Sequence, residues 1–435
     1  MNYLYCLLAI LVSGYILSNT ILKFRMSYWD GVSCGFAFFI GGPLLQVIIF
    51  SEISSRERNL PALSIDNSNE SVFLFLAVFS FIFYILYIIN KKNDSLININ
   101  ININNLKVYF ISFTAIYLFF AFYIFLLSGK LSGGHWYENY DALYSGSAIS
   151  TVIGNFYNVM RICFPGVLIF AVIKKLLSNK EFIIISIIYG SFELLISSNR
   201  VIILLIIFSF ILLFYKNNKK YIFLLVLISP LIMQFNHAFP IMRGLMFSEN
   251  VSIEQLLNSY EVATDFRKSE GFNIEESVSG LFEADNLNVV KFVYDNFPSR
   301  YNYVKGETVY LKTATFFLPK AIWPNKPEGF GGFLGPEITG TEVLTLNSTI
   351  IGEAYGNFGL LALILVPLNL YLTGILFKNL HGTILNYCPF FIAFASWRFE
   401  FAFIIISAFA LFIIKKFIYS KFYRKILLYL NIIID

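Results

Sequence analysis

Two charged residues lie in the middle of long apolar runs, where a charge is costly and therefore a candidate for chemistry. Arg161 and Glu193 each stand near the centre of such a run, and the two runs are consecutive along the chain. An ionisable side chain at the centre of a membrane helix costs about 2.5–3.5 kcal/mol. If the runs form antiparallel neighbouring helices, the two side chains meet at the same depth. We expect either a structural ion pair or a role in a reaction or a proton path.

A second group of charged residues lies at the ends of apolar runs, and all of its members are predicted on one side of the membrane. The group contains Arg200, Arg243, Glu353, Arg398 and Glu400. The planar guanidinium fork binds phosphate through two parallel hydrogen bonds, so the arginines suit an anionic lipid headgroup. The alternative for each arginine alone is a side chain that reaches from a helix end to the headgroups without a further role.

The composition requires that most of these residues be carried by membrane helices. Of the 435 residues, 57% are apolar and 14% are charged, and the mean hydropathy is +0.69. Soluble domains carry about 25% charged residues. This excludes a soluble enzyme and a nucleic-acid-binding module. The four cysteines lie inside apolar runs, so neither a disulfide framework nor a metal cluster is indicated.

The apolar runs predict an all-α polytopic membrane protein with about 11 membrane-spanning helices, because each run has a length typical of a span. Residues 1–238 hold the first eight predicted spans, residues 239–345 form one large extracytoplasmic loop, and residues 346–435 hold the last three spans and a basic tail. The predicted spans are 3–22, 32–50, 72–90, 108–127, 150–173, 182–197, 201–215, 221–238, 354–376 and two short helices on either side of Arg398 within 386–414.

Lysine and arginine are concentrated in the loops that alternate with the large one. Positive charge stays cytoplasmic in short loops, so the large loop is predicted outside, with the N-terminus outside and the C-terminus inside. Within the loop, apolar residues recur with a helical rhythm over 253–262 and 289–297, which predicts two helices. The prolines of 319–327 exclude a helix there, and the glycines that follow allow close backbone approach to a ligand.

Two stretches carry a resemblance to a known family. Residues 319–327 read Pro-Lys-Ala-Ile-Trp-Pro-Asn-Lys-Pro, and residues 352–359 read Gly-Glu-Ala-Tyr-Gly-Asn-Phe-Gly at the opening of a membrane helix. Together with the Ser-Asn-Arg break at 198–200, the late outer loop and the Arg398 turn, they resemble bacterial O-antigen (Wzy-type) polymerases, the oligosaccharide repeat-unit polymerases. The resemblance implies an inner-membrane glycosyltransferase of the GT-C kind. Such an enzyme transfers a growing glycan from undecaprenyl pyrophosphate onto the next lipid-linked repeat unit, on the periplasmic face.

The resemblance also implies roles for the charged residues. Arg200, Arg243 and Arg398 are predicted to hold the pyrophosphate, and Glu353 to deprotonate the attacking sugar hydroxyl. The alternative for Glu353 is a carboxylate held by the dipole of a helix N-terminus. Predicted substrate-binding residues are Arg300, Trp323, Lys326, Asn357, Arg161 and Glu193. For Trp323, which would stack on a sugar ring, a place in the interfacial aromatic belt is the alternative.

No metal ion and no other cofactor is required by this chemistry. The predicted partners are the lipid-linked oligosaccharide donor and acceptor, the lipid bilayer and a chain-length regulator, but no nucleic acid. The competing functions are a lipid-linked oligosaccharide flippase and an O-antigen ligase. A flippase would carry charge through the whole membrane depth, and the histidine typical of the ligases is replaced here by Ser348.

Overall fold

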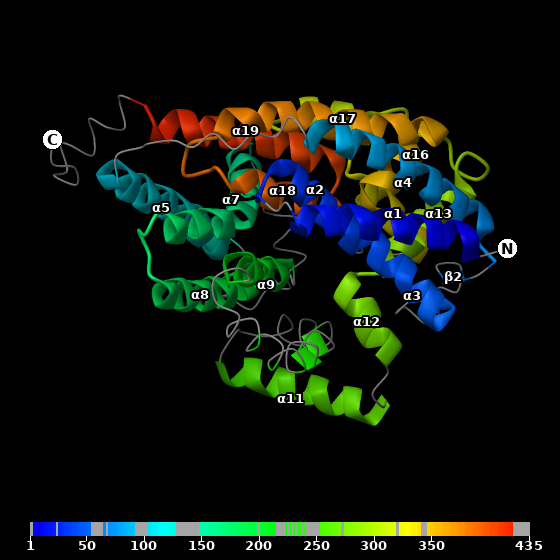
Figure 1. The fold of residues 1–435 in the computed structure, drawn as a ribbon, viewed down its shortest axis with the longest axis horizontal. Helices are drawn as coiled ribbons and strands as arrows, with labels where there is room; N and C mark the ends of the chain where they lie inside the picture. The colour runs from blue at the N-terminus through cyan, green and yellow to red at the C-terminus, as the bar shows by residue number, and fades with distance from the viewer. Residues whose placement is uncertain are drawn as a thin grey trace.

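Apolar helices lie side by side along one long axis in a computed structural model of the chain (Figure 1). The structure describes residues 3–22, 25–53, 64–66, 68–91, 103–127, 148–197, 201–214, 253–270, 274–318, 322–340 and 346–420, with single residues and pairs between 223 and 239. The helix α1 begins at one end of this axis and α19 ends at the other (Figure 1). The protein is an all-α polytopic membrane protein, apart from one small sheet.

The first half of the described chain contains α1 (Tyr3–Leu22), α2 (Tyr28–Phe36), the π-helix η1 (Ala37–Gly41), α3 (Gly42–Phe50), α4 (Glu70–Lys91), α5 (Ile103–Leu127), α7 (Ala148–Ile173), α8 (Asn179–Ser197) and α9 (Val201–Phe214). The second half contains α11 (Ile253–Glu270), α12 (Ile274–Phe282), α13 (Asp285–Asn296), η3 (Glu307–Leu311), α14 (Lys312–Ala314), α15 (Phe330–Thr339), α16 (Thr349–Phe358), η4 (Gly359–Leu361), α17 (Ala362–Phe377), η5 (Lys378–Leu380), α18 (Cys388–Ser396) and α19 (Phe401–Ile418).

Seven helices of the described chain are long and apolar enough to cross a membrane. They are Tyr3–Leu22, Tyr28–Phe50, Glu70–Asn90, Leu106–Leu127, Ser150–Ile173, Thr349–Leu380 and Phe401–Ile418. Three further predicted spans are not among these seven. Helix α9 is apolar but short, α8 carries three charged residues, and 221–238 falls mostly outside the described residues.

Helix α18 has nine residues and is therefore too short to cross the membrane alone. At 1.5 Å per residue it covers about 14 Å, roughly half of a hydrocarbon core of about 30 Å. It still lies within a segment that runs the full length of α19. The hydroxyl of Tyr419, just after α19, binds the backbone N–H of Ile384 at 3.2 Å, while Phe401 begins α19 at the other end. Between these two points the chain forms turns before α18 and a further turn between α18 and α19.

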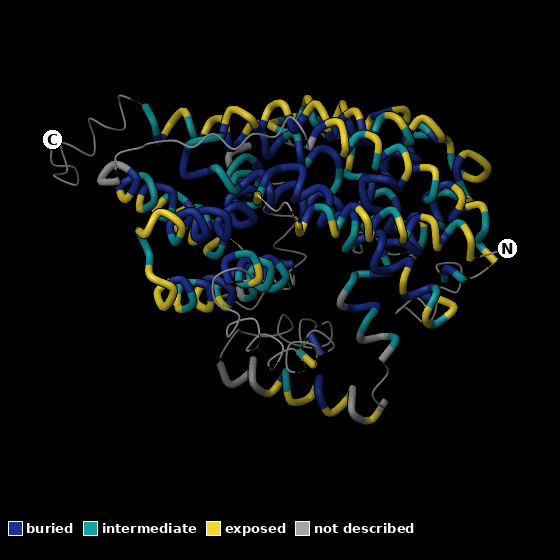
Figure 2. The backbone as a smooth tube through the Cα atoms, in the orientation of Figure 1, coloured by how far each residue is buried: buried dark blue, intermediate teal, exposed yellow. Residues whose placement is uncertain are grey.

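The centre of the bundle is the contact of α18 with α2, and the buried residues of both helices lie in the middle of the molecule (Figure 2). Two glycines one turn apart allow the approach, because a Cβ on Gly31 would lie 2.1 Å from the Phe390 carbonyl oxygen and one on Gly35 2.7 Å from that of Phe394. Small residues at this spacing let helix backbones come close in membranes. The indole N–H of Trp397 donates to the Val32 carbonyl at 2.8 Å. The two helices run parallel, since both residue numbers rise together along the contact.

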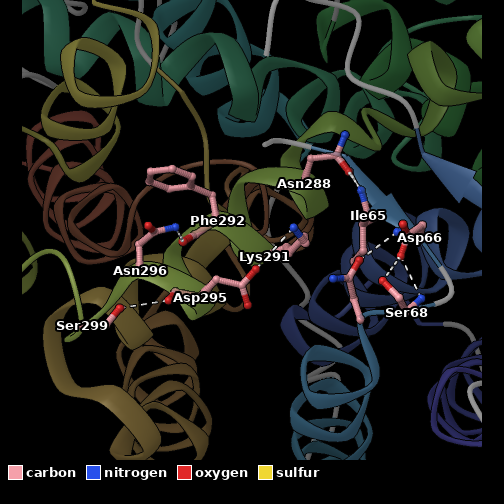
Figure 3. A network of polar contacts seen from close by, with 10 residues as sticks. Ile65, Asp66, Ser68, Asn288, Lys291, Phe292, Asp295, Asn296 and Ser299 are labelled. Carbon is pink, nitrogen blue, oxygen red and sulfur yellow. Dashed lines mark hydrogen bonds and ion pairs between the residues drawn. The ribbon is translucent and has the colours of Figure 1, made fainter. Parts of the chain in front are cut away.

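The predicted outer loop contains helices where its rhythm predicted them, α11 and α13, and no helix over the described residues 322–329. Helix α13 is tied to the two-stranded sheet of β1 (Glu52–Ile53) and β2 (Ile65–Asp66), whose strands pair antiparallel. The Asn288 side chain accepts a hydrogen bond from the Ile65 N–H at 3.1 Å (Figure 3). Hydrogen bonds from the side chain and backbone of Ser68 lower the pKa of Asp66. Two distant segments are thereby joined at this end of the bundle.

Candidate functional site

Charged side chains from four segments meet at the turn between α18 and α19. We call this set the α19 corner: Glu283 between α12 and α13, Lys312 at the start of α14, Glu353 in α16, and Arg398 and Glu400 before α19. Glu353 and Arg398 are two of the residues predicted from the sequence as catalytic, and the structure brings them to the same place. The corner also contains residues for which no role was predicted.

The basic residues of the corner are already bound to carboxylates. The Arg398 Nε pairs with the Glu283 carboxylate, and the Lys312 ammonium pairs with that of Glu400. These four side chains are between 13% and 25% exposed, so the pairs line a partly accessible surface. The other Glu400 oxygen accepts from the Gly331 N–H at 3.3 Å. With Glu353, the corner holds three carboxylates and two cations.

Glu353 is the buried member of the corner, with 1% of its surface exposed. Its Oε2 accepts the N–H of Phe401, the first residue of α19, at 2.6 Å. Its Oε1 is buried and has no hydrogen-bond partner within the described chain. A carboxylate at a helix N-terminus is stabilised by the helix dipole. Glu353 occupies such a position at the N-terminus of α19. The sequence predicted Glu353 at the N-terminus of the helix that contains it. In the structure, Glu353 lies one turn inside that helix, α16, which begins at Thr349.

Asn357, a predicted substrate-binding residue, is buried and holds η3 against α16. Its side-chain oxygen accepts from the Gly306 N–H at 2.9 Å. Its amide donates to the Thr308 hydroxyl and to the Glu353 carbonyl, both at 2.8 Å. The Thr308 hydroxyl also interacts with the Glu353 carboxyl group. Asn357 therefore positions η3 and the Thr308 hydroxyl next to Glu353.

The glycines beside Glu353 are closely packed and leave no space for a ligand at the positions of their missing Cβ atoms. A Cβ on Gly356 would lie 2.1 Å from the Phe330 ring, and one on Gly352 would lie 2.7 Å from Ser348. Protein side chains fill the space because the missing Cβ atoms allow α15 to pack against α16. Gly329 similarly lies against Glu400 and Lys312, since its Cβ would meet the Glu400 carboxylate at 2.0 Å.

The other predicted site residues of the outer side do not reach the corner through any contact that we observe. Arg200 and Arg243 fall outside the described residues. Arg300 is exposed, with its guanidinium 5.2 Å from the centre of the Tyr301 ring. Trp323 is half-buried in the segment before α15. The Lys326 ammonium donates to the carbonyls of Phe316 at 3.3 Å and Leu318 at 2.7 Å, which closes the proline-rich loop.

Arg161 and Glu193 come together around tyrosines on α5 and α7. The two Glu193 oxygens accept hydrogen bonds from the hydroxyls of Tyr117, at 2.5 Å, and Tyr157, at 2.8 Å. The Arg161 guanidinium lies 5.5 Å from the centre of the Tyr157 ring. The predicted proximity of the two charges is therefore present, with Tyr157 in contact with both.

A proline explains a further contact in this tyrosine cluster. Pro165 lies inside α7 and has no N–H, so the Arg161 carbonyl four residues earlier lacks its helical donor. The Tyr189 hydroxyl donates to that carbonyl instead. The Tyr189 hydroxyl thus replaces the backbone donor that α7 lacks at Pro165.

Comparison with protein-family models, with curated proteins and with solved structures finds no match to this chain. Within the described residues, no group of three or more His, Cys, Asp and Glu side chains is placed to hold a metal ion.

Sequence reasoning assigned no role to Glu283, Lys312 and Thr308. All three lie in the hydrophilic segment that was predicted as an outer loop, among many residues of the same types. Only a distinctive spacing could have singled them out, and their partners are far away in the chain: Arg398 for Glu283, Glu400 for Lys312 and Asn357 for Thr308.

Proposed function

We propose that this protein is a membrane glycosyltransferase that polymerises undecaprenyl-pyrophosphate-linked oligosaccharide repeat units into O-antigen or a related surface polysaccharide. The proposal places it in the bacterial inner membrane with a GT-C-like arrangement of about 11 crossings. It places the N-terminus in the periplasm and the C-terminus in the cytoplasm. Helix α1 begins at one end of the long axis and α19 ends at the other, which agrees with an odd number of crossings (Figure 1).

One observation carries the chemical part of the proposal. Glu353 is a buried carboxylate with one free oxygen, at a corner whose other charged members are partly exposed. A carboxylate with an unused oxygen can accept a proton from a hydroxyl group that reaches it. General base catalysis of this kind contributes about 10²–10⁴-fold to a rate.

The reaction needs little from the protein beyond this base and correct placement. The acceptor hydroxyl attacks the anomeric carbon of the donor, and the glycosidic bond to pyrophosphate breaks with its electron pair on the leaving phosphate. Glu353 Oε1 takes the hydroxyl proton. The Phe401 N–H and the Thr308 hydroxyl hold the carboxyl group in position for this transfer.

The distribution of basic residues supports an outer location for the corner. Lys415 and Lys416 lie in the last turn of α19, at the opposite end of that helix from Glu400 and Phe401. The Lys415 ammonium binds the Asn379 carbonyl, after the end of α17. Positive charge marks the cytoplasmic end of membrane helices, which supports a periplasmic location for the corner.

The deciding experiment is a gel of surface polysaccharide from a strain that lacks this gene. We expect the ladder to collapse to a single repeat unit on the lipid core, because export and ligation survive when only polymerisation is lost. Re-expression of the wild-type chain should restore the ladder. Loss of every repeat unit would point to a flippase or a ligase and would refute the polymerase proposal.

A further inference from the structure

A segment of the predicted outer loop packs against the middle of two apolar helices. The Asn369 amide donates to the Tyr310 hydroxyl at 3.3 Å, and Asn369 stands halfway along α17. The Phe316 ring lies edge-on to Phe409, with 5.9 Å between the ring centres, and Phe409 stands halfway along α19. Both helices belong to candidate membrane spans. At 1.5 Å per residue, their midpoints lie about 12 Å from their ends, a depth within the hydrocarbon core.

The chain leaves the α19 corner to reach this depth and then returns to it. Before the segment, the Thr308 hydroxyl accepts from the Asn357 amide and interacts with the Glu353 carboxyl group. After the segment, the Gly331 N–H donates to Glu400 at 3.3 Å, just before α19 begins. Both ends are thus held at the same end of α19, while Phe316 reaches the middle of that helix.

The polar side chains of residues 308–318 all have hydrogen-bond partners within the protein. They are Thr308, Tyr310, Lys312, Thr313 and Thr315. The hydroxyls of Thr313 and Thr315 donate to backbone carbonyls four residues earlier in the same helical segment. A segment in hydrocarbon needs such internal partners, because no water is present to replace a missing one.

The turn at the end of this helical segment is held by a lysine. The Lys326 ammonium donates to the carbonyls of Phe316 at 3.3 Å and Leu318 at 2.7 Å. Carbonyls at a helix C-terminus have no helical N–H partner and must be bound by another donor. Ionisable side chains within a membrane pair with one another or with backbone carbonyls. The contacts of Lys326 therefore agree with a turn that lies inside the membrane.

Apolar side chains on the same segment are exposed. Tyr310 is 44% exposed, Leu311 39% and Phe317 51%. Phe409, which contacts Phe316, is itself 50% exposed on α19. The exposed apolar surface of the segment therefore continues that of a membrane helix. Polar groups bound inside the protein and apolar groups on the surface fit a contact with acyl chains rather than with water.

We propose that residues 308–318 and 322–331 form the two arms of a re-entrant hairpin, and that the acyl chains of the bilayer cover its exposed apolar side. This part of the predicted outer loop then lies within the membrane, entering and leaving on the side of the α19 corner. Because Lys312 belongs to the hairpin, the corner borders the bilayer as well as the periplasm. The proposal concerns position in the membrane and is independent of the glycosyltransferase reaction.

The test places nitroxide spin labels on single introduced cysteines in the full chain, reconstituted in vesicles of phosphatidylethanolamine and phosphatidylglycerol. The test variants are Leu311→Cys and Phe317→Cys. Phe412→Cys, at a 43% exposed position of α19, is the lipid reference, and Asn302→Cys, at an exposed position before the hairpin, is the water reference. The four native cysteines are buried, and the unsubstituted chain, treated with the label in parallel, gives the background.

The readout is the collision rate of each label with oxygen, which concentrates in hydrocarbon, and with a nickel chelate, which stays in water. We expect the labels at 311 and 317 to behave like the label at 412, with strong oxygen collisions and loss of nickel collisions. The label at 302 should show the opposite pattern. Two test positions are used so that a variant that fails to insert leaves the other one to decide.

Two results would overturn the proposal. Nickel collisions at 311 and 317 as frequent as those at 302 would place the segment in water, as an ordinary outer loop. Loss of both oxygen and nickel collisions at these positions would show that protein, and not lipid, covers the surface. Neither result depends on polymer formation, so the hairpin and the proposed polymerase can fail separately.

Discussion

Glu193 and Glu353 are both buried glutamates of this protein, but their surroundings differ. Glu193 is 0% exposed, and its two oxygens accept hydrogen bonds from Tyr117 and Tyr157. Glu353 is 1% exposed, and its Oε2 accepts the N–H of Phe401. The Thr308 hydroxyl interacts with the carboxyl group, and Oε1 has no hydrogen-bond partner among the described residues. The partners of Glu193 come from neighbouring membrane helices. The N–H that binds Glu353 belongs to the backbone of Phe401 at the start of α19.

This difference separates a structural carboxylate from a candidate catalytic one. Both carboxylate oxygens of Glu193 accept hydrogen bonds from within the protein, and these bonds connect α8 to α5 and α7. The free oxygen of Glu353 leaves capacity for a ligand, at a continuing cost in stability. Burial alone is thus a poor guide to function, and the number of satisfied atoms is a better one.

The largest expected effect comes from removing the charge of each glutamate in turn. Glu353→Gln should lower polymerisation by about 10²–10⁴-fold, because the amide cannot accept the proton. The protein should stay in the membrane, since the amide oxygen still accepts the Phe401 N–H. Glu193→Gln should keep polymerisation and lower the thermal midpoint. The measurement is polymer formed per unit of membrane-inserted protein.

Two results would contradict the assignment of Glu353 as the catalytic glutamate and Glu193 as the structural one. Near-normal polymer from Glu353→Gln, with loss only in Glu353→Ala, would show that the carboxyl group merely caps α19. Loss of polymer in Glu193→Gln at normal protein levels would move the reaction, or a proton path, to the tyrosine cluster.

A second prediction concerns how the corner is assembled. Arg398 and Glu400 follow α18, which depends on close contact with α2. Gly31→Ala places a Cβ 2.1 Å from the Phe390 carbonyl oxygen, and overpacking of this kind costs about 1–3 kcal/mol. We expect a lower thermal midpoint and less polymer in this variant.

The matched control is Gly14→Ala in α1, where an added Cβ has no atom within 4 Å. Replacing a helical glycine by alanine there should stabilise the protein by about 0.5–1 kcal/mol. Equal stability of the two variants, measured by thermal unfolding in detergent, would show that the close α2–α18 contact does not contribute to stability.

A third prediction tests whether the tyrosine cluster is structural. Tyr189→Phe leaves the Arg161 carbonyl without a donor, which costs about 1–3 kcal/mol for a buried group. Pro165→Ala restores the helical N–H, so the double variant should recover most of the lost stability. The measurement is a double-mutant cycle of thermal unfolding. Simple additivity of the two changes would contradict the repair role of Tyr189.

The sequence predicted the class of this fold because membrane insertion depends on local composition. Each run such as 72–90 or 108–127 is apolar by itself, and the structure has α4 and α5 there. The helices α11 and α13 also followed from their local rhythm. Helices α18 and α19 lie on either side of Arg398, as the charged break within 386–414 predicted, but the close packing of α18 against Gly31 and Gly35 was not visible in the sequence.

The sequence by itself determined the membrane class, most of the helices and the choice of Glu353 and Arg398 as candidates, since a charge beside an apolar run is visible in one dimension. Only the tertiary structure decided which groups surround Glu353, which of its oxygens is bound, and that its neighbouring glycines are filled by Phe330 and Ser348. The physical reason is that hydrogen bonds and close packing act over a few ångströms. Their partners come from segments whose meeting depends on the whole bundle.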